Sequence, residues 1–156
     1  MLAGPLDRSV RHQVLRDRRA GYEATMSNAG LEPMIVTSNI GYEAGVEATI
    51  RLLSERRTTT AIFAASDELA AGAVRAANDV GLAVPGDLSV VGFDDHWIAS
   101  ALNLTTVNQS VKSHGIDGAQ LLLDHLADPM IPPRDVLIPP RLMTRDTTAP
   151  PRARPS

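Results

Sequence analysis

Two short apolar runs, each followed at once by polar and acidic residues, constrain the fold of this chain more than any other feature. Residues 61–65 and 90–93 are apolar throughout, and Ser66-Asp67 and Asp94-Asp95 come directly after them. Such runs are typical of strands that are covered on both faces of a parallel sheet. In open α/β sheets, ligands bind outside the carboxyl ends of the strands. The pattern therefore predicts a sheet edge where polar side chains meet a small ligand.

Strand candidates recur at equal intervals along the first part of the chain. They begin near Met34, Ala61 and Leu88, and the spacing is that of consecutive strand–helix units. Segments with helical periodicity lie between them, and Ser66 is suited to cap the helix that extends to Val80. The sequence therefore predicts an α/β fold with a parallel sheet.

The remaining segments have different patterns. A further helix is expected over about 9–29, and its basic residues are interpreted as a solvated face rather than a binding feature. Residues 96–109 have no clear period and are expected to form a crossover loop. An amphipathic helix is predicted at about 111–127, followed by weak strands at 136–138 and 141–144. The proline-rich residues 150–156 are expected to be a disordered tail.

Composition excludes several classes of function. The chain of 156 residues has no cysteine and a net charge of −3, so it offers no thiol chemistry and no general affinity for nucleic acid. Neither a membrane-spanning run nor a signal peptide is evident, and a cytoplasmic location is expected. Residues 2–5 resemble the end of a strand with nothing before it, so further sequence is expected upstream.

Seven short motifs, in order, resemble the LacI/GalR family of bacterial transcriptional regulators. The two longest are Ala64-Ala-Ser-Asp-Glu-Leu-Ala-Ala-Gly-Ala73 and Val80-Gly-Leu-Ala-Val-Pro-Gly-Asp-Leu-Ser-Val-Val-Gly-Phe-Asp-Asp95. The others are Leu2-Ala-Gly-Pro5, Arg18-Arg-Ala-Gly-Tyr22, Gly41-Tyr-Glu-Ala-Gly45, Leu104-Thr-Thr-Val-Asn-Gln109 and Arg145-Asp-Thr-Thr148. Together they extend the resemblance over residues 2–149.

The resemblance implies a three-layer αβα fold of the periplasmic-binding-protein-like type I, with two lobes and a ligand between them. Residues 2–95 correspond to most of the second lobe, 96–110 to a crossover, and 111–145 to a helix and a strand of the first lobe. The family's DNA-binding head has no counterpart in this chain. We therefore expect operator DNA to be bound only through a head that lies elsewhere.

The resemblance also implies residues for effector binding. Arg18 matches an arginine that reaches a sugar-like effector, and a guanidinium suits vicinal hydroxyls or an anion. Asp94 matches an aspartate that accepts hydrogen bonds, whereas Asp95 is expected to cap the following turn. Ser66 stands where many members have asparagine, and helix capping is an equal alternative for it. The complete predicted set is Arg18, Asn39, Ile40, Ser66, Asp94 and Gln109.

A homodimer is expected through the helix that starts at Ser66 and through residues 96–103. The predicted interface residues are Leu69, Ala70, Ala73 and Trp97; packing of the alanines on their own sheet is the alternative. Catalysis and cofactors are not expected, because no nucleophile elbow, P-loop or dinucleotide motif is present. A metal is not expected either, because the four histidines have no metal-ligand spacing. Two alternatives remain: a free-standing sugar-binding protein, and a Mg²⁺-dependent phosphoryl-transfer domain that uses Asp94 and Asp95.

Overall fold

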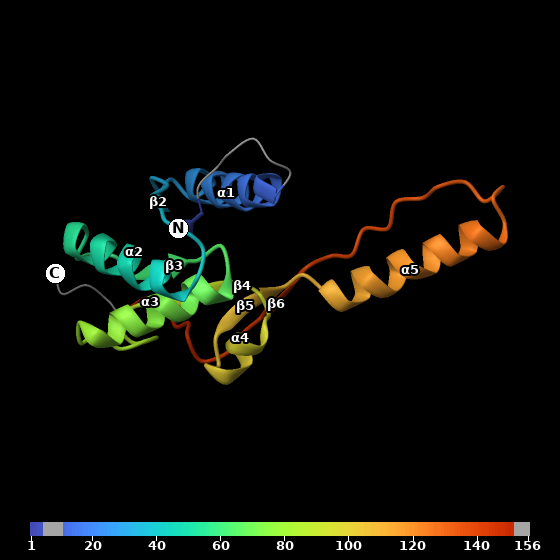
Figure 1. Cartoon of the computed structure of the whole chain (residues 1–156). Helices are drawn as coiled ribbons and strands as arrows, with labels where there is room; N and C mark the ends of the chain where they lie inside the picture. Colours follow the sequence, from blue (N-terminus) through green and yellow to red (C-terminus); the bar gives the residue numbers. More distant parts are fainter. Residues whose placement is uncertain (5–10, 152–156) are drawn as a thin grey trace.

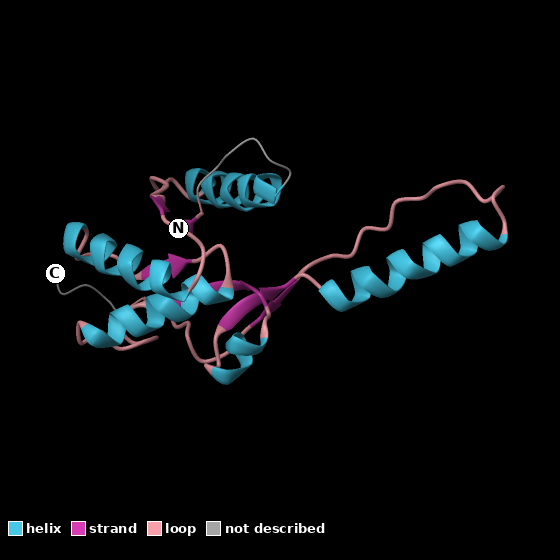
Figure 2. Cartoon of the chain, viewed as in Figure 1, coloured by secondary structure: helices cyan, strands magenta, loops and turns pink. Residues whose placement is uncertain are grey.

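The structure, a computed structural model, describes residues 1–4 and 11–151, in which a two-stranded and a four-stranded sheet are accompanied by helices (Figures 1 and 2). In these parts of the chain the elements follow one another in the order of strand–helix units. They are β1 (Leu2–Ala3), α1 (Arg11–Asn28), β2 (Val36–Thr37), α2 (Tyr42–Glu55), β3 (Ala61–Phe63), α3 (Asp67–Asp79), β4 (Ser89–Asp94), α4 (Trp97–Ala101), β5 (Thr105–Asn108), α5 (Val111–Ala127) and β6 (Arg141–Met143).

The strands form two hydrogen-bonded sheets, one in the order β1-β2 and the other in the order β3-β4-β5-β6. Strands β3, β4 and β5 are parallel, and β6 runs antiparallel to β5. Strand β1 pairs in parallel with β2, and a bridge between Leu2 and Ala64 connects this pair to β3. Because the parallel strands end at one edge, Ala65, Asp94 and Gln109 come close together there.

The alternation of side chains along β4 separates the two faces of the sheet. Gly92 faces α3, where a Cβ atom would meet Ala70. Phe93 faces α1, and the guanidinium of Arg18 lies 3.7 Å from the centre of its ring. On the same face, the rings of Tyr22 and Phe63 stack at 6.4 Å. The predicted three-layer αβα architecture is therefore present.

Helices α2 and α3 pack closely because each has a glycine at the contact. A Cβ atom on Gly45 would meet the backbone of Leu69, and one on Gly72 would lie 2.7 Å from the backbone nitrogen of Val46. Under these helices lies the core, whose largest fully buried apolar side chains include Leu2, Leu69, Leu88, Leu104 and Val90. The core thus joins β1 and the helical layer to the central strands.

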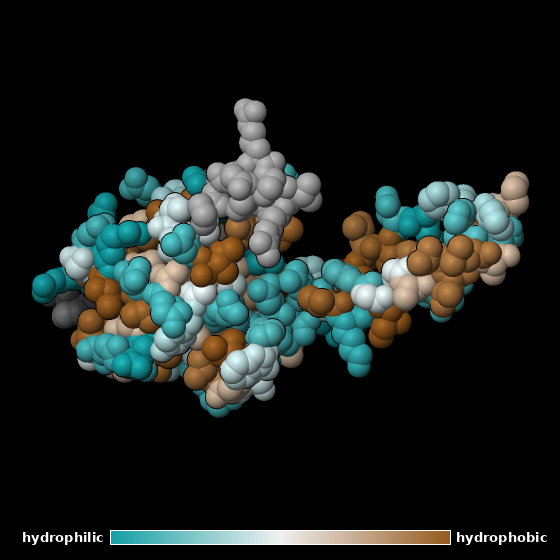
Figure 3. Space-filling model, in the orientation of Figure 1, coloured by the Kyte–Doolittle hydropathy of each residue, from teal (hydrophilic) through white to brown (hydrophobic). Residues whose placement is uncertain are grey.

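Helix α5 and the segment that returns to β6 project away from the sheet (Figure 1). No residue of α5 is buried, and apolar side chains gather along this arm (Figure 3). Those most exposed include Val111, Ile116, Leu122, Leu123, Leu126, Met130 and Leu137. Within residues 1–4 and 11–151, none of the helices combines the length and the apolar character that a membrane crossing requires.

The structure differs from the prediction in three segments. Residues 96–109, predicted as a loop, contain α4 and β5. The prediction was wrong because Thr105 and Thr106 are polar in the sequence, yet both are buried in β5 with bonded hydroxyl groups. Residues 136–138 form no strand, and β6 covers only Arg141–Met143. Of the predicted tail, Pro150 and Pro151 have no regular structure, and the rest lies outside the described residues.

Candidate functional site

A hollow of about 200 Å³ opens beside the carboxyl ends of β3 and β4. Four of the predicted effector-binding residues contribute to it: Arg18 from α1, Ile40 from the loop after β2, Ser66 before α3, and Asp94 at the end of β4. The remainder of the lining is apolar or small and consists of Gly4, Val14, Leu15, Ala65 and Leu69.

Arg18 reaches from α1 into the layer between the helix and the sheet. Its Nη1 donates to the carbonyl oxygen of Ala65, and its Nη2 donates to Oδ1 of Asp94 at 3.1 Å. The side chain is 11% exposed, and its Nε is buried without a hydrogen-bond partner. Burial lowers the pKa of Arg18, although the charge of Asp94 opposes this shift. A cation therefore lines the hollow, whereas its unbonded Nε is shielded inside the protein.

Asp94 adopts a backbone conformation that is unusual for a residue other than glycine. Its φ is 116°, and holding a side chain in this region costs roughly 1–3 kcal/mol. Oδ1 accepts hydrogen bonds from Arg18 and from Nε2 of Gln109, the latter at 2.8 Å. Oδ2 accepts no hydrogen bond from the residues that the structure describes. Burial raises the pKa of Asp94, whereas Arg18 lowers it, and the net shift is upward.

Ser66 caps α3, as its sequence position predicts. Its backbone is extended, and its Oγ accepts a hydrogen bond from the backbone nitrogen of Leu69 at 3.3 Å. The hydroxyl hydrogen is not used in this bond. Ser66 can therefore cap the helix and still donate a hydrogen bond into the hollow, so the two alternatives for this residue are compatible.

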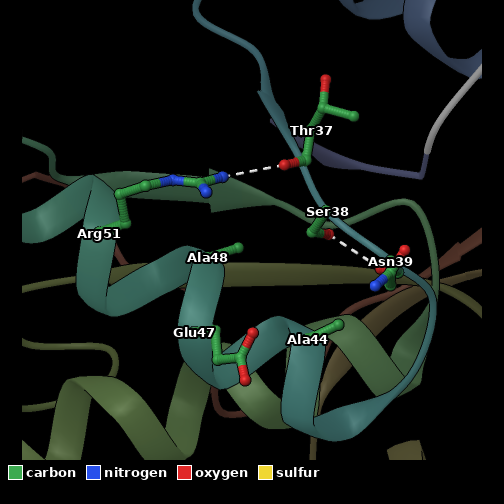
Figure 4. Close-up of a pocket in the computed structure, with 7 residues that line it drawn as sticks. All are labelled: Thr37, Ser38, Asn39, Ala44, Glu47, Ala48 and Arg51. Carbon is green, nitrogen blue, oxygen red and sulfur yellow. Dashed lines mark hydrogen bonds between the residues drawn. The ribbon is translucent and has the colours of Figure 1, made fainter.

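The structure separates Asn39 from the other predicted residues. Asn39 lines a second hollow of about 320 Å³ between the end of β2 and α2, together with Glu47 and Arg51 (Figure 4). There Nη2 of Arg51 donates to the carbonyl oxygen of Thr37 at 2.9 Å. Ile40 is 56% exposed and gives the first hollow an aliphatic wall. Asn39 is therefore not placed beside Arg18 and Asp94.

A second cluster of polar residues surrounds Asp95. Its Oδ1 accepts from Nη2 of Arg145, and its Oδ2 accepts from Nδ2 of Asn108, both at 2.7 Å. Burial alone would raise the pKa of Asp95, but the hydrogen bonds from Arg145 and Asn108 lower it below its ordinary value. The sequence reasoning missed the roles of Arg145 and Asn108. Their signal was their presence in the motifs at 104–109 and 145–148.

Asp67, which follows the first apolar run in the sequence, is a third acidic residue near this edge, and its partners were not predicted. It is 1% exposed, its Oδ1 accepts from the hydroxyl of Thr106, and its Oδ2 accepts from the backbone nitrogen of His96 at 2.7 Å. Burial raises the pKa of Asp67, although these hydrogen bonds oppose the shift. Asp67 therefore joins the start of α3 to the turn after Asp95.

The arrangement does not fit the Mg²⁺ alternative. Asp94 and Asp95 face different cationic partners, Arg18 and Arg145, rather than sharing one open position. Over the described parts of the chain, no group of three or more histidine or acidic side chains could hold a metal ion. The two carboxylates are organised for hydrogen bonding.

The predicted dimer residues have two different environments. Leu69, Ala70 and Ala73 are at most 1% exposed and pack within the chain's own core. They have no free surface for a partner, and the alternative that these alanines pack on their own sheet agrees with the structure. Trp97, at the start of α4, is 69% exposed.

Comparison with known proteins agrees with this fold. Residues 2–148 match the sequence family described as periplasmic binding protein-like domain. Catabolite control protein A of Priestia megaterium is 31% identical over 94% of this chain and 45% of its own length. A dimeric Lac repressor with an 11-residue C-terminal deletion is 31% identical with a TM-score of 0.85, over 97% of this chain and 55% of the repressor chain.

A third protein carries a ligand. It is a LacI family transcriptional regulator from Enterococcus faecium with bound ribose, 27% identical with a TM-score of 0.81 over 96% of this chain and 56% of that chain. These relatives are transcriptional regulators and not enzymes. The chain spans about half the length of the relatives that it matches.

Proposed function

The chain belongs to the LacI family of transcriptional regulators, in the C-terminal portion of the effector-binding domain, and from this premise we propose that it forms one wall of a site for a small, neutral sugar. The observation that carries the proposal is the grouping of Arg18, Asp94 and Gln109 beside the hollow. The relative from Enterococcus faecium, with its bound ribose, supports the same class of ligand.

The unused hydrogen-bonding groups favour a ligand with several hydroxyls. Oδ2 of Asp94 is a free acceptor among the described residues, and the guanidinium of Arg18 lies beside this carboxylate at the hollow. A hydroxyl can donate to a carboxylate and accept from a guanidinium at the same time. Two adjacent hydroxyls would therefore satisfy both groups without adding a charge to the site.

The lining favours a compact ligand. Among the residues that the structure describes, no aromatic ring lines the hollow, and Val14, Leu15 and Ile40 supply aliphatic surface instead. Aliphatic side chains offer no ring for stacking on a sugar face. Affinity would therefore depend mainly on the polar groups, and a pentose or hexose fits this wall better than a long oligosaccharide.

The wider function of the regulator is also part of this proposal. We propose a homodimer in which α4 contributes, because Trp97 and Leu102 expose apolar surface there. DNA recognition would come from a part of the regulator outside this chain. A regulator that acts on DNA would work in the cytoplasm.

Titration of the ¹⁵N-labelled chain with ribose and with other neutral pentoses and hexoses, followed by NMR, tests the proposal. We expect resonance shifts at Asp94 and Gln109, and an affinity that is about ten- to hundredfold weaker in Arg18→Ala, because a hydrogen bond to a charged group is lost. Arg75→Ala is the matched control, since Arg75 forms an exposed ion pair with Asp79 on α3. Equal affinities in the two variants, or no binding of any of these sugars, would contradict the proposal.

A further inference from the structure

Asp94 and Asp95 are consecutive residues that both have a positive φ. The values are 116° for Asp94 and 54° for Asp95. Neither residue is glycine, so the backbone is strained at both positions unless its surroundings hold it. This turn determines where the carboxylate of Asp94 points, and whatever holds the turn controls that direction.

Three side chains, Asp95, Asn108 and Arg145, form what we call the Arg145 clamp. Asp95 accepts one hydrogen bond on each carboxylate oxygen, from Arg145 and from Asn108. Arg145 is fixed in turn, because its Nη1 donates to the carbonyl oxygen of Leu104 at 2.8 Å and its backbone nitrogen donates to Oγ1 of Thr105 at 2.9 Å. The clamp is mostly buried, with side-chain exposures of 21% for Arg145 and 13% for Asp95.

The clamp stands directly beside the groups of the proposed site. Asn108 holds Asp95, and the next residue, Gln109, holds Asp94. Each aspartate also has its own arginine, Arg18 for Asp94 and Arg145 for Asp95. Arg145 does not line the hollow. Its direct link to the residues beside the hollow is Asp95, the neighbour of Asp94 in the chain.

We infer that Arg145 is a positioning residue of the effector site, which directs the carboxylate of Asp94 toward Arg18 and Gln109 by holding Asp95 in its left-handed turn. The inference rests on the proposed function for its biological meaning, but its geometric content is independent of any ligand. Asn108 ends β5 shortly before α5, and Arg145 follows β6. The clamp therefore also connects the site to both segments that lead to the projecting arm.

The test compares side-chain resonances in the ligand-free chain. We expect Arg145→Gln to shift the side-chain amide signals of Gln109 and the Nε–H signal of Arg18 as far as Asp94→Asn does. The conservative variant Arg145→Lys should restore part of the native positions, because it keeps the charge. Arg75→Gln, which breaks the exposed ion pair on α3, should leave both signals unchanged.

A second variant covers the case in which Arg145→Gln does not fold. Asp95→Asn keeps the size of the side chain and removes the charge that Arg145 binds, and the same shifts are expected. If Gln109 and Arg18 keep their native signals while the side-chain amide of Asn108 shifts, the inference is wrong. The clamp would then only attach the segment around Arg145 to β5 and have no effect on Asp94.

Ribose titration of the same variants separates the two proposals. We expect affinity in Arg145→Gln to fall about tenfold. Native affinity together with shifted Gln109 signals would overturn the role of Arg145 in binding. Absence of ribose binding in the unmodified chain would contradict the proposed function and leave the ligand-free result on the clamp intact.

Discussion

Asp94 and Asp95 show how far adjacent residues of one type can differ in environment. Asp94 shares its Oδ1 between Arg18 and Gln109 and leaves Oδ2 open, and burial raises its pKa. Both carboxylate oxygens of Asp95 accept hydrogen bonds, from Arg145 and Asn108. Burial would raise the pKa of Asp95, but these hydrogen bonds lower it below its ordinary value. One carboxylate is thus available to a ligand, whereas the other is committed to structure.

The lowered pKa of Asp95 predicts a specific dependence of stability on pH. A carboxylate with a lower pKa in the folded state stabilises the fold above its unfolded pKa, about 3.9. This contribution disappears as the pH falls through the folded pKa. We expect Asp95→Asn to reduce the free energy of unfolding by about 2 kcal/mol at pH 7 and the difference to shrink below about pH 4.

Urea unfolding followed by circular dichroism at a series of pH values measures this difference. Asp79→Asn, which removes the acidic partner of an exposed arginine on α3, should cost well under about 1 kcal/mol. A loss in Asp95→Asn that stays constant from pH 7 to pH 3 would show that charge is not its origin.

At the residue scale, sequence was a good guide where a side chain is fixed by a regular element. Arg18 lies on α1, Asp94 ends β4, and Gln109 follows β5, and the structure brings all three together. Asn39 lies instead in an irregular loop before Gly41, whose φ is 115°. The direction of a side chain in such a loop depends on the local backbone, which periodicity does not reveal.

Between elements, the closest packing is that of α2 on α3, and it predicts a strong effect of one methyl group. A Cβ atom on Gly72 would overlap the backbone of α2 at Tyr42 and Val46, which cannot move aside as a flexible side chain can. We expect Gly72→Ala to destabilise the fold by about 3 kcal/mol. Unfolding in urea, followed by far-UV circular dichroism, measures the loss.

Gly21→Ala on α1 is the matched control for Gly72→Ala. Nothing lies within 4 Å of a Cβ atom at Gly21, and alanine favours a helix over glycine by about 1 kcal/mol. This variant should therefore be unchanged or more stable. If both variants behaved alike, the close contact between α2 and α3 would not hold in solution.

The elements themselves were predictable to different degrees. Spacing and apolar pattern predicted α2, α3, β3 and β4, because their side chains face one continuous core. Strand β5 was missed because its two buried residues, Thr105 and Thr106 on opposite faces of the sheet, are polar, and their hydroxyls find partners in Thr148 and Asp67. Polar groups can be buried when they form hydrogen bonds with residues distant in the sequence. A hydropathy pattern does not reveal such partners and therefore does not predict this burial.

For the whole molecule, the most consequential surface is the arm formed by α5 and the segment after it. Helix α5 has no buried residue, and Leu122, Leu123 and Leu126 are each more than half exposed. Exposed apolar patches of this kind favour association. The packed sheet and its helices contain the proposed site, whereas the arm presents an exposed apolar face.

We therefore expect the isolated chain to form oligomers through α5. Replacing Leu122, Leu123 and Leu126 by glutamine should lower the mass measured by size-exclusion chromatography with light scattering, because the apolar area that association buries is removed. Trp97→Gln, on the other exposed apolar surface, tests the contribution of α4. If Trp97→Gln alone dissociates the oligomer and the triple variant does not, association runs through α4 instead. A native chain that is monomeric at all concentrations would contradict both routes.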